Sequence, residues 1–339
     1  MLIWYNRFNI DKISKKIKVR FSLLNAQITA LVDNIEKVII GKRTVILHMI
    51  SALLAQGHVL IEDIPGVGKT QLVSALSRSV NGRFHRVQMT PDIMPSDIVG
   101  YTMIHPETKK ITYQRGAAVC NFLLADEINR ASPKAQSSLL EIMEEFQISL
   151  EGQTLPLPQP FMALATQNPI ETYGTYHLPE AQMDRFLMRI SMGYPSKEEE
   201  IALLQRMEGE NPAKQLEPVL SLQEVIAMQQ EVKKIRVHPL VQAYIYDIVE
   251  VSRNHDGIRL GVSPRGTIAL QRAVRAWAYI HSRDYATPDD VRAVAPSVLA
   301  HRIILSQQGK NQYVSQEAVI DQVLRQVRAP MPKEGLFSG

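Results

Sequence analysis

The sequence is almost free of cysteine. Cys120 is the single cysteine among 339 residues, so no disulfide can form within the chain. No pattern of metal-ligating residues includes it. It opens an apolar run, and a free cysteine in such a setting behaves as a small hydrophobic residue. We therefore expect Cys120 to be buried, and a fold held together by disulfides is excluded.

Long apolar runs are also missing. No stretch approaches the roughly 18 residues that a membrane-spanning helix needs. Residues 1–23 form a basic N-terminal extension that lacks the continuous apolar segment and the cleavage site of a signal peptide. This extension is favoured as a mobile tail over a segment that lies on a membrane surface, and the protein is expected in the cytoplasm. Its aromatic and basic residues include Trp4, Tyr5, Phe8, Lys12, Lys15, Lys16, Lys18 and Arg20.

Composition places the chain among ordinary globular proteins. Hydrophobic residues make up 45% of it and charged residues 21%, and the length suggests two domains. The net charge of +4 is a mild basic excess that acidic runs such as 198–200 interrupt. No homeodomain, zinc-finger or RNA-binding signature is present. We therefore expect a solvated surface of mixed charge and no specific nucleic-acid partner.

The first half of the chain has the pattern of an α/β fold. Short apolar runs alternate with helical patterns, as in a parallel sheet covered by helices on both faces. Two pairs of short segments flank polar turns and predict inserted β-hairpins, 101–104 with 111–114 and 148–150 with 153–155. The runs expected to form the core strands are 58–62, 83–89, 121–126 and 161–166.

After Pro195 the pattern becomes helical. Ser196 with Glu199, and Ser221 with Glu224, fit capping boxes. Three prolines stand where helices are expected to begin, and a loop is expected over 208–218. The second half is therefore predicted to be an all-α lid domain. The predicted divisions are a basic extension at 1–23, the α/β core at 24–195, the lid at 196–330 and a tail at 331–339.

A phosphate-binding loop follows the first predicted strand and opens a helix. Glycines let backbone N–H groups close on phosphate oxygens, and the helix N-terminus adds its positive dipole. Lys69 supplies a charge to the β- and γ-phosphates, and Thr70 supplies a hydroxyl for Mg²⁺. The strict pattern begins with glycine, where this chain has Asp63. The predicted ATP-binding residues are Pro65, Gly66, Val67, Gly68, Lys69, Thr70 and Gln71.

Polar residues at the ends of two later strands complement this loop. Asp126 follows a buried strand, where it is placed to hold Mg²⁺, and Glu127 is placed to accept a proton from the attacking water. Asn168 ends another strand and is a candidate to position that water or to contact the γ-phosphate. Arg185 and Arg265 carry guanidinium groups suited to phosphoryl charge, although spacing alone does not separate them from ordinary surface arginines.

Six ordered motifs resemble the MoxR family of AAA+ ATPases, and the resemblance extends from about residue 24 to residue 302. Asp63 is usual in that family. In residues 114–119 the chain departs from the run usual there, so the exit of the first hairpin is expected to differ in shape. The motifs lie at 62–70, 90–100, 125–131, 165–169, 178–186 and 262–265.

The resemblance implies an AAA+ core with a helical lid, assembled as a homo-oligomer that is typically a hexameric ring. It identifies the hairpins as the helix-2 insert and the pre-sensor hairpin. It assigns sensor 1 to Asn168, sensor 2 to Arg265 and the trans-acting arginine to Arg185. The segment with Ile40 and Gly41 is similar to the family's adenine-side segment. A partner with a von Willebrand factor A domain, and a chaperone-like role in metal insertion or complex maturation, are further implications.

Two other functions stay open at this point. One is a motor subunit similar to that of magnesium chelatase, and a related option is translocation on DNA. The other is a scaffold that binds ATP as a switch and scarcely hydrolyses it. Four intact residues argue against the scaffold: Glu127, Asn168, Arg185 and Arg265.

Overall fold

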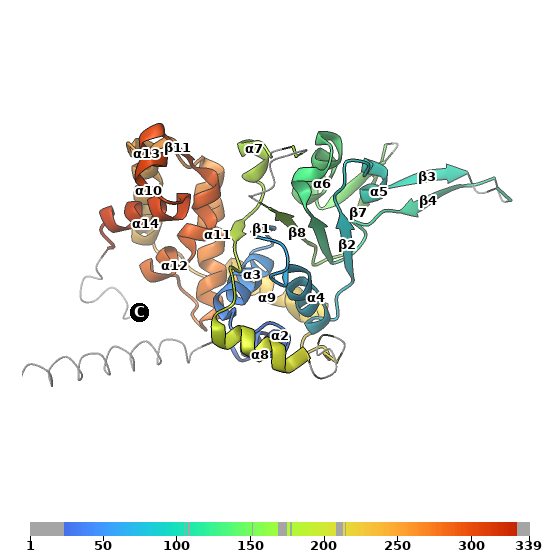
Figure 1. The fold of residues 1–339 in the computed structure, drawn as a ribbon, viewed down its shortest axis with the longest axis horizontal. Coiled ribbons are helices and arrows are strands. Elements are labelled where there is room, and N and C mark those ends of the chain that lie inside the picture. Colours follow the sequence, from blue (N-terminus) through green and yellow to red (C-terminus); the bar gives the residue numbers. More distant parts are fainter. Residues whose placement is uncertain are drawn as a thin grey trace, which may run out of the picture.

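The computed structural model describes residues 24–104, 106–107, 109–150, 152–168, 175–176, 178–207, 213 and 215–330. The predicted extension, the tail and most of the predicted loop at 208–218 lie outside these residues. The structure has a core built on one sheet and a set of helices beside it, with a hairpin that extends away from the core (Figure 1). Within the described part of the chain, no helix has the length and apolar character to cross a membrane.

The central sheet has five strands in the order β2-β5-β8-β1-β9, and every neighbouring pair is parallel. The four predicted core strands are confirmed. The fifth strand, β9, was not predicted because it has only three residues. The strands are β1 (Val59–Glu62), β2 (Phe84–Gln88), β5 (Phe122–Asp126), β8 (Met162–Gln167) and β9 (Met188–Ile190).

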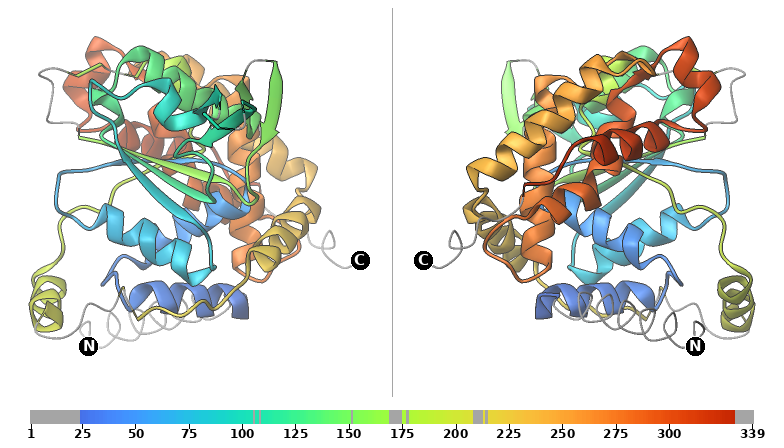
Figure 2. Two further views of the ribbon diagram at one scale, coloured as in Figure 1. Left: turned by 90° about the vertical axis from the view of Figure 1, so that its right-hand side faces the viewer. Right: turned by 90° about the vertical axis from the view of Figure 1, so that its left-hand side faces the viewer.

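Helices cover both faces of the sheet, as Figure 2 shows. Alternate residues of one strand reach opposite faces, so in β5 the side chain of Leu124 joins one hydrophobic cluster and that of Leu123 the other. Cys120 is buried in the second cluster, as predicted. The first cluster contains α2 (Ala26–Glu36), α3 (Arg43–Leu54) and α4 (Lys69–Ser79), and the second contains α5 (Pro95–Val99), η1 (Ile128–Arg130) and α6 (Pro133–Glu145).

Both predicted hairpins are present. The first pairs β3 (Gly100–Ile104) with β4 (Ile111–Arg115) and projects from the core (Figure 1). At the base of this hairpin two backbone segments approach each other so closely that a Cβ on Gly116 would lie 2.3 Å from the backbone nitrogen of Gly100. The second pairs β6 (Gln147–Leu150) with β7 (Gln153–Pro156) directly after α6.

The second half is mainly helical and its predicted caps are confirmed. Ser221 and Glu224 form a reciprocal capping box, and Ser196 and Glu199 exchange the same two bonds. Prolines begin three helices as predicted. The helices of this half are α8 (Lys197–Met207), α9 (Leu222–Lys234), α10 (Pro239–Asn254), α11 (Pro264–Ile280), α12 (Pro288–Leu299), η3 (Ala300–Arg302), α13 (Gln307–Gln312) and α14 (Gln316–Gln326), and the short helix α7 (Glu180–Met183) precedes β9 in the core.

The lid is not purely helical, because β10 (Ile258–Leu260) pairs antiparallel with β11 (Ile304–Leu305). Strands of two and three residues are too short to show an alternating pattern, which explains why they were not predicted. The lid helices pack onto the core through α11 against α3 and through α12 against β9. One hydrophobic cluster runs through both parts, so the lid is docked on the core through a continuous apolar interior. By contrast, α8 lies apart from α10–α14 (Figure 1).

Candidate functional site

The loop between β1 and α4 has the shape that a phosphate group requires. Gly66 and Gly68 have φ angles of 86° and 91°, a region that favours glycine. Gly68 is the N-cap of α4, so the first backbone N–H groups of the helix have no partner within the helix. Lys69 is the first helical residue, and its Nζ donates to the carbonyl oxygens of Asp63 and Ile64 at 2.9 and 3.0 Å. The lysine is thus held over the loop by neutral acceptors that a phosphate oxygen can replace.

Asp63, where the strict motif has glycine, connects this loop to the end of β9. Its buried carboxylate accepts hydrogen bonds from the hydroxyl of Ser191 at 3.3 Å and from the backbone nitrogens of Met192 and Gly193. Glycine has no side chain to make these bonds. The residue therefore fixes the exit of the last core strand, which leads toward α8.

Asp126 ends β5 and is held on both of its carboxylate oxygens. Oδ2 accepts from Nε and Nη2 of Arg86 at 3.0 and 2.6 Å, and Oδ1 accepts from the hydroxyl of Thr166 at 2.5 Å. Arg86 was not predicted from the sequence. It lies on β2, which pairs in parallel with β5, and its place two residues before Gln88 puts both side chains on one face of that strand.

Glu127 begins the turn after β5 in a left-handed conformation, with φ at 58°. Its backbone nitrogen donates to Thr166 Oγ1 at 2.8 Å. Its carboxylate accepts from Nε2 of Gln88 at 2.7 Å and pairs with Nε of Arg130 at 3.2 Å. Neither partner was predicted from the sequence. Glu127 is thus held in one orientation by groups from β2 and η1.

A cavity of about 360 Å³ brings these residues together. Asn168, buried at the end of β8, also lines it, as predicted from its position. Three residues that were predicted to bind ATP, Ile40, Gly41 and Val67, are not among those that line it. Val67 packs against the hydrophobic cluster, and Gly41 lies against the carboxylate of Glu199, which would clash with a Cβ there. The cavity is lined by Pro65, Gly66, Gly68, Lys69, Thr70, Gln71, Arg86, Gln88, Asp126, Glu127, Thr166 and Asn168.

The oxygen donors of this cavity fit a magnesium ion that is shared with a nucleotide. The Thr70 hydroxyl and the Asp126 carboxylate line the same space, and hard cations prefer oxygen ligands. Within the described residues, no group of three or more His, Cys, Asp or Glu side chains is gathered as a metal site. Such a sparse donor set suits Mg²⁺, which keeps several waters and takes further oxygens from phosphates.

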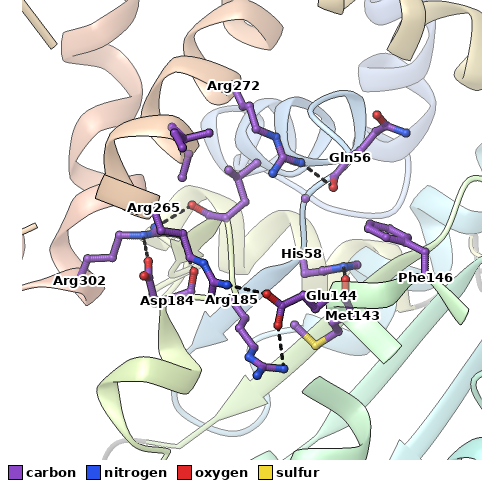
Figure 3. Close-up of a pocket in the computed structure, with 14 residues that line it drawn as sticks. Gln56, His58, Met143, Glu144, Phe146, Asp184, Arg185, Arg265, Arg272 and Arg302 are labelled. Carbon is purple, nitrogen blue, oxygen red and sulfur yellow. Dashed lines mark hydrogen bonds and ion pairs between the residues drawn. The ribbon is translucent and has the colours of Figure 1, made fainter. Parts of the chain in front are cut away.

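Arg185 and Arg265 lie together in a second cavity of about 370 Å³ (Figure 3). Glu144 on α6 bridges them, because one oxygen is 3.2 Å from Nη1 of Arg185 and the other 2.5 Å from Nη2 of Arg265. Arg185 also donates to the carbonyl of Leu140 at 2.8 Å. None of the residues that line this cavity lines the first one. The structure therefore joins the two predicted arginines, and it separates them from Lys69 and Glu127 within one chain. We call Arg185, Arg265 and Glu144 the arginine face.

His58 fixes the end of α6 beside the arginine face. Its Nε2 lies 2.7 Å from the carbonyl oxygen of Met143, and its Nδ1 accepts from the backbone nitrogen of Ala163 at 3.0 Å. Burial lowers the pKa of His58 to about 4, so the ring is neutral at neutral pH. Through these two bonds the neutral ring links α6 to β8. Its contact on α6 is Met143, the residue that precedes Glu144.

A phosphate loop on a five-stranded parallel sheet, followed by a helical lid, defines a P-loop ATPase of the AAA+ class. The family model described as "ATPase family associated with various cellular activities (AAA)" matches residues 58–188, and the model described as "AAA lid domain" matches residues 250–323. Chaperone MoxR1 of Mycobacterium tuberculosis is 40% identical over 89% of this chain and 83% of its own length. The chain belongs to the MoxR family of AAA+ ATPases.

Two further relatives match over nearly their whole length. The protein YeaC of Bacillus subtilis is 45% identical over 90% of this chain and 95% of its own. A crystal structure of a candidate ATPase from Cytophaga hutchinsonii superimposes with a TM-score of 0.83 at 34% identity. That alignment covers 95% of this chain and 99% of the other. The predicted α/β core with a helical lid is thereby confirmed.

Proposed function

We propose that this protein binds Mg²⁺-ATP and hydrolyses it to ADP and phosphate. The observation that carries the proposal is the first cavity, where the phosphate loop, Asp126, Glu127 and Asn168 face one space. Phosphoryl transfer needs positioning and charge stabilisation more than covalent chemistry. These residues supply a cation, a carboxylate for the metal, a base for water and a buried amide.

Each residue has a part in this reaction. Lys69 exchanges its loop carbonyls for phosphate oxygens. Thr70 and Asp126 hold the magnesium ion, which neutralises charge on the phosphates when it is bound. Glu127 accepts a proton from the water that attacks the γ-phosphorus, and the bond to the bridging oxygen of ADP breaks. Gln88 and Arg130 both contact Oε2 of Glu127, and the carboxylate has further acceptor capacity for the attacking water.

The arginine face supports assembly into a ring. Arg185 and Arg265 line a different cavity from Lys69 of the same chain, so they are suited to the nucleotide of a neighbouring subunit. We propose a homo-oligomer, of hexameric form as the family resemblance implies, in which each site is completed by the next subunit. In the ring, phosphate oxygens take the place of the Glu144 carboxylate between the two arginines.

The biological role that we propose is chaperone-like remodelling of a protein partner. The support is the relative from Mycobacterium tuberculosis that is named as a chaperone. A partner with a von Willebrand factor A domain, and a part in metal insertion or complex maturation, follow from the family resemblance and belong to the same proposal.

Steady-state phosphate release tests the proposed hydrolysis. Wild type should release phosphate in a Mg²⁺-dependent way, and Lys69→Ala should lose both turnover and tight ATP binding in isothermal titration, because the loop loses its cation. Lys234→Ala is the control, since that lysine is exposed and pairs with Glu231 on α9. Unchanged ATP affinity in Lys69→Ala would contradict the assignment of the loop.

A further inference from the structure

Arg302, in the lid, donates hydrogen bonds to several acceptors in the core and to one in the lid. Its side chain is 2% exposed. Its guanidinium has five N–H groups, and it reaches five oxygen acceptors. Nε donates to Asp184 Oδ1 at 2.6 Å and Nη2 to the carbonyls of Asp184 and Phe186 at 3.1 and 2.7 Å. Nη1 donates to the carbonyls of Leu187, at 3.2 Å, and Val298.

Four of these acceptors belong to the residues on either side of Arg185. The segment 184–187 lies between α7 and β9 and has no regular secondary structure. Buried carbonyl groups outside helices and sheets need other donors, and Arg302 supplies them here. The backbone that carries Arg185 is therefore shaped by a side chain from another domain.

The same junction also fixes the start of the helix that carries Arg265. The second carboxylate oxygen of Asp184 accepts from the hydroxyl of Ser263 at 3.0 Å, and Ser263 is the N-cap of α11. Asp184 thus contacts both Arg302 and the residue that begins α11. In Figure 3 Asp184, Arg302, Arg185 and Arg265 lie close to one another, and Glu144 bridges the far ends of the two arginines.

The surroundings of Arg302 are built to accept its side chain. Gly266 packs directly against this side chain: a Cβ at that position would lie only 2.9 Å from Cδ of Arg302. His301 binds the carbonyl of Phe186 at 3.0 Å, and burial together with the charge of Arg302 holds the pKa of His301 well below its usual range. The histidine is therefore neutral and adds no second positive charge. Replacement of a buried ion pair by hydrophobic residues is often neutral or stabilising, so these directed bonds are better explained by a positional role than by stability alone.

We propose that Arg302 is a positioning residue for the trans-acting arginine: it holds residues 184–187 from the lid, so that the docked lid sets where Arg185 meets the neighbouring subunit's ATP. This inference rests on the proposed function, in which Arg185 acts in trans. Under this proposal, Arg185 reaches the neighbouring subunit's ATP in the correct position only when the lid of its own subunit is docked on the core.

The test uses Arg302→Lys in the assembled protein. Lysine keeps the charge but has three N–H groups on one nitrogen, which cannot span the three residues that the guanidinium holds. ATP affinity should stay at the wild-type value, because Arg302 does not line the nucleotide cavity. A displacement of about 1 Å costs about 10²-fold in rate, so kcat should fall by about that factor. Arg189→Lys is the control, since Arg189 on β9 also joins core to lid, through the carboxylate of Glu317 on α14, lines neither of the two cavities, and should keep wild-type turnover.

Mixing experiments separate positioning from general damage. Arg302→Lys subunits keep an intact Glu127, so mixing them with Glu127→Gln subunits, which keep an intact Arg185, should restore turnover at some interfaces. Mixing them with Arg185→Ala subunits should restore none. If Arg302→Lys does not fold, as judged by circular dichroism, Asp184→Asn takes its place with the same expectations.

Two results would overturn the inference. One is unchanged turnover in Arg302→Lys. The other is failure of Glu127→Gln to rescue Arg302→Lys under conditions in which it rescues Arg185→Ala. Failure of the Arg185→Ala mixture as well would show that the trans arrangement is wrong, and the positioning role would fall with it.

Discussion

Arg86 donates two hydrogen bonds, of 3.0 and 2.6 Å, to a single carboxylate oxygen of Asp126. The two residues come from neighbouring parallel strands, β2 and β5. Asp126 is the carboxylate proposed to hold Mg²⁺, so a fixed positive charge lies beside the metal site. The guanidinium and the metal ion therefore compete for the same carboxylate. We expect this site to bind Mg²⁺ better together with ATP, whose phosphates add negative charge, than as the free ion.

Arg86→Gln should lower the Mg²⁺ concentration at which turnover is half-maximal, because the substitution removes the competing cation. Titration of phosphate release with Mg²⁺ at fixed ATP measures this shift. Arg83→Gln is a suitable control, since Arg83 precedes the same strand and does not line the cavity. A higher Mg²⁺ requirement in Arg86→Gln would show that the arginine binds phosphate and does not compete with the metal.

Asp63→Gly, which restores the glycine of the strict loop motif, should destabilise the protein. Two backbone nitrogens near the end of β9 lose their acceptor, and a buried donor left without a partner costs about 1–3 kcal/mol. Urea unfolding measures the loss. ATP affinity should change little, because Asp63 does not line the nucleotide cavity. Asp63→Asn, which keeps an acceptor oxygen, should lose less stability, and equal stability of Asp63→Gly and wild type would contradict this role.

Stability should fall as the pH decreases from about 6.5 toward about 4. Burial lowers the pKa of His58 to about 4 in the folded protein, while an exposed histidine titrates near about 6.5. Between these values the unfolded chain binds a proton that the folded chain does not, which favours unfolding. His58→Gln should therefore lose less Tm than wild type between about pH 7.5 and about pH 5. An equal loss in both proteins would show that His58 does not contribute.

The sequence predicts most of the fold because two central strands, β5 and β8, are buried on both faces. Residues 122–126 and 162–167 are buried throughout, and such runs stand out between helical patterns. The strand β9 was not predicted because three residues are too few to show a recognisable apolar run. The pair β10 and β11 was not predicted for the same reason, since these strands have three and two residues.

Within the site, local motifs are predictable and long-range partners are not. Lys69 and Thr70 belong to one continuous loop, so their chemistry follows from their order. Arg86 and Gln88 become site residues only because β2 lies beside β5, a pairing that no single motif records. Glu144 and Arg302 were missed for the same reason. Their role depends on how α6 and the lid dock against the segment around Arg185.

Glu127→Gln should bind ATP and lose turnover by about 10²–10⁴-fold, because the amide keeps the shape of the carboxylate and cannot accept a proton. Isothermal titration and phosphate release measure the two effects. Gln88 donates to the carboxylate in wild type and has an acceptor oxygen to offer in the variant. Turnover close to wild type would show that another residue activates the water.

Phosphate release from mixed rings of Arg185→Ala and Glu127→Gln subunits tests most directly whether neighbouring subunits complete each other's sites. Each variant alone should be nearly inactive, since a trans-acting arginine contributes about 10³–10⁵-fold to phosphoryl transfer. After subunit exchange, some interfaces pair an intact Glu127 on one subunit with an intact Arg185 on the next. The account predicts that the mixture exceeds both parents. A mixture as inactive as its parents, with mixed rings proven by mass spectrometry, would contradict it.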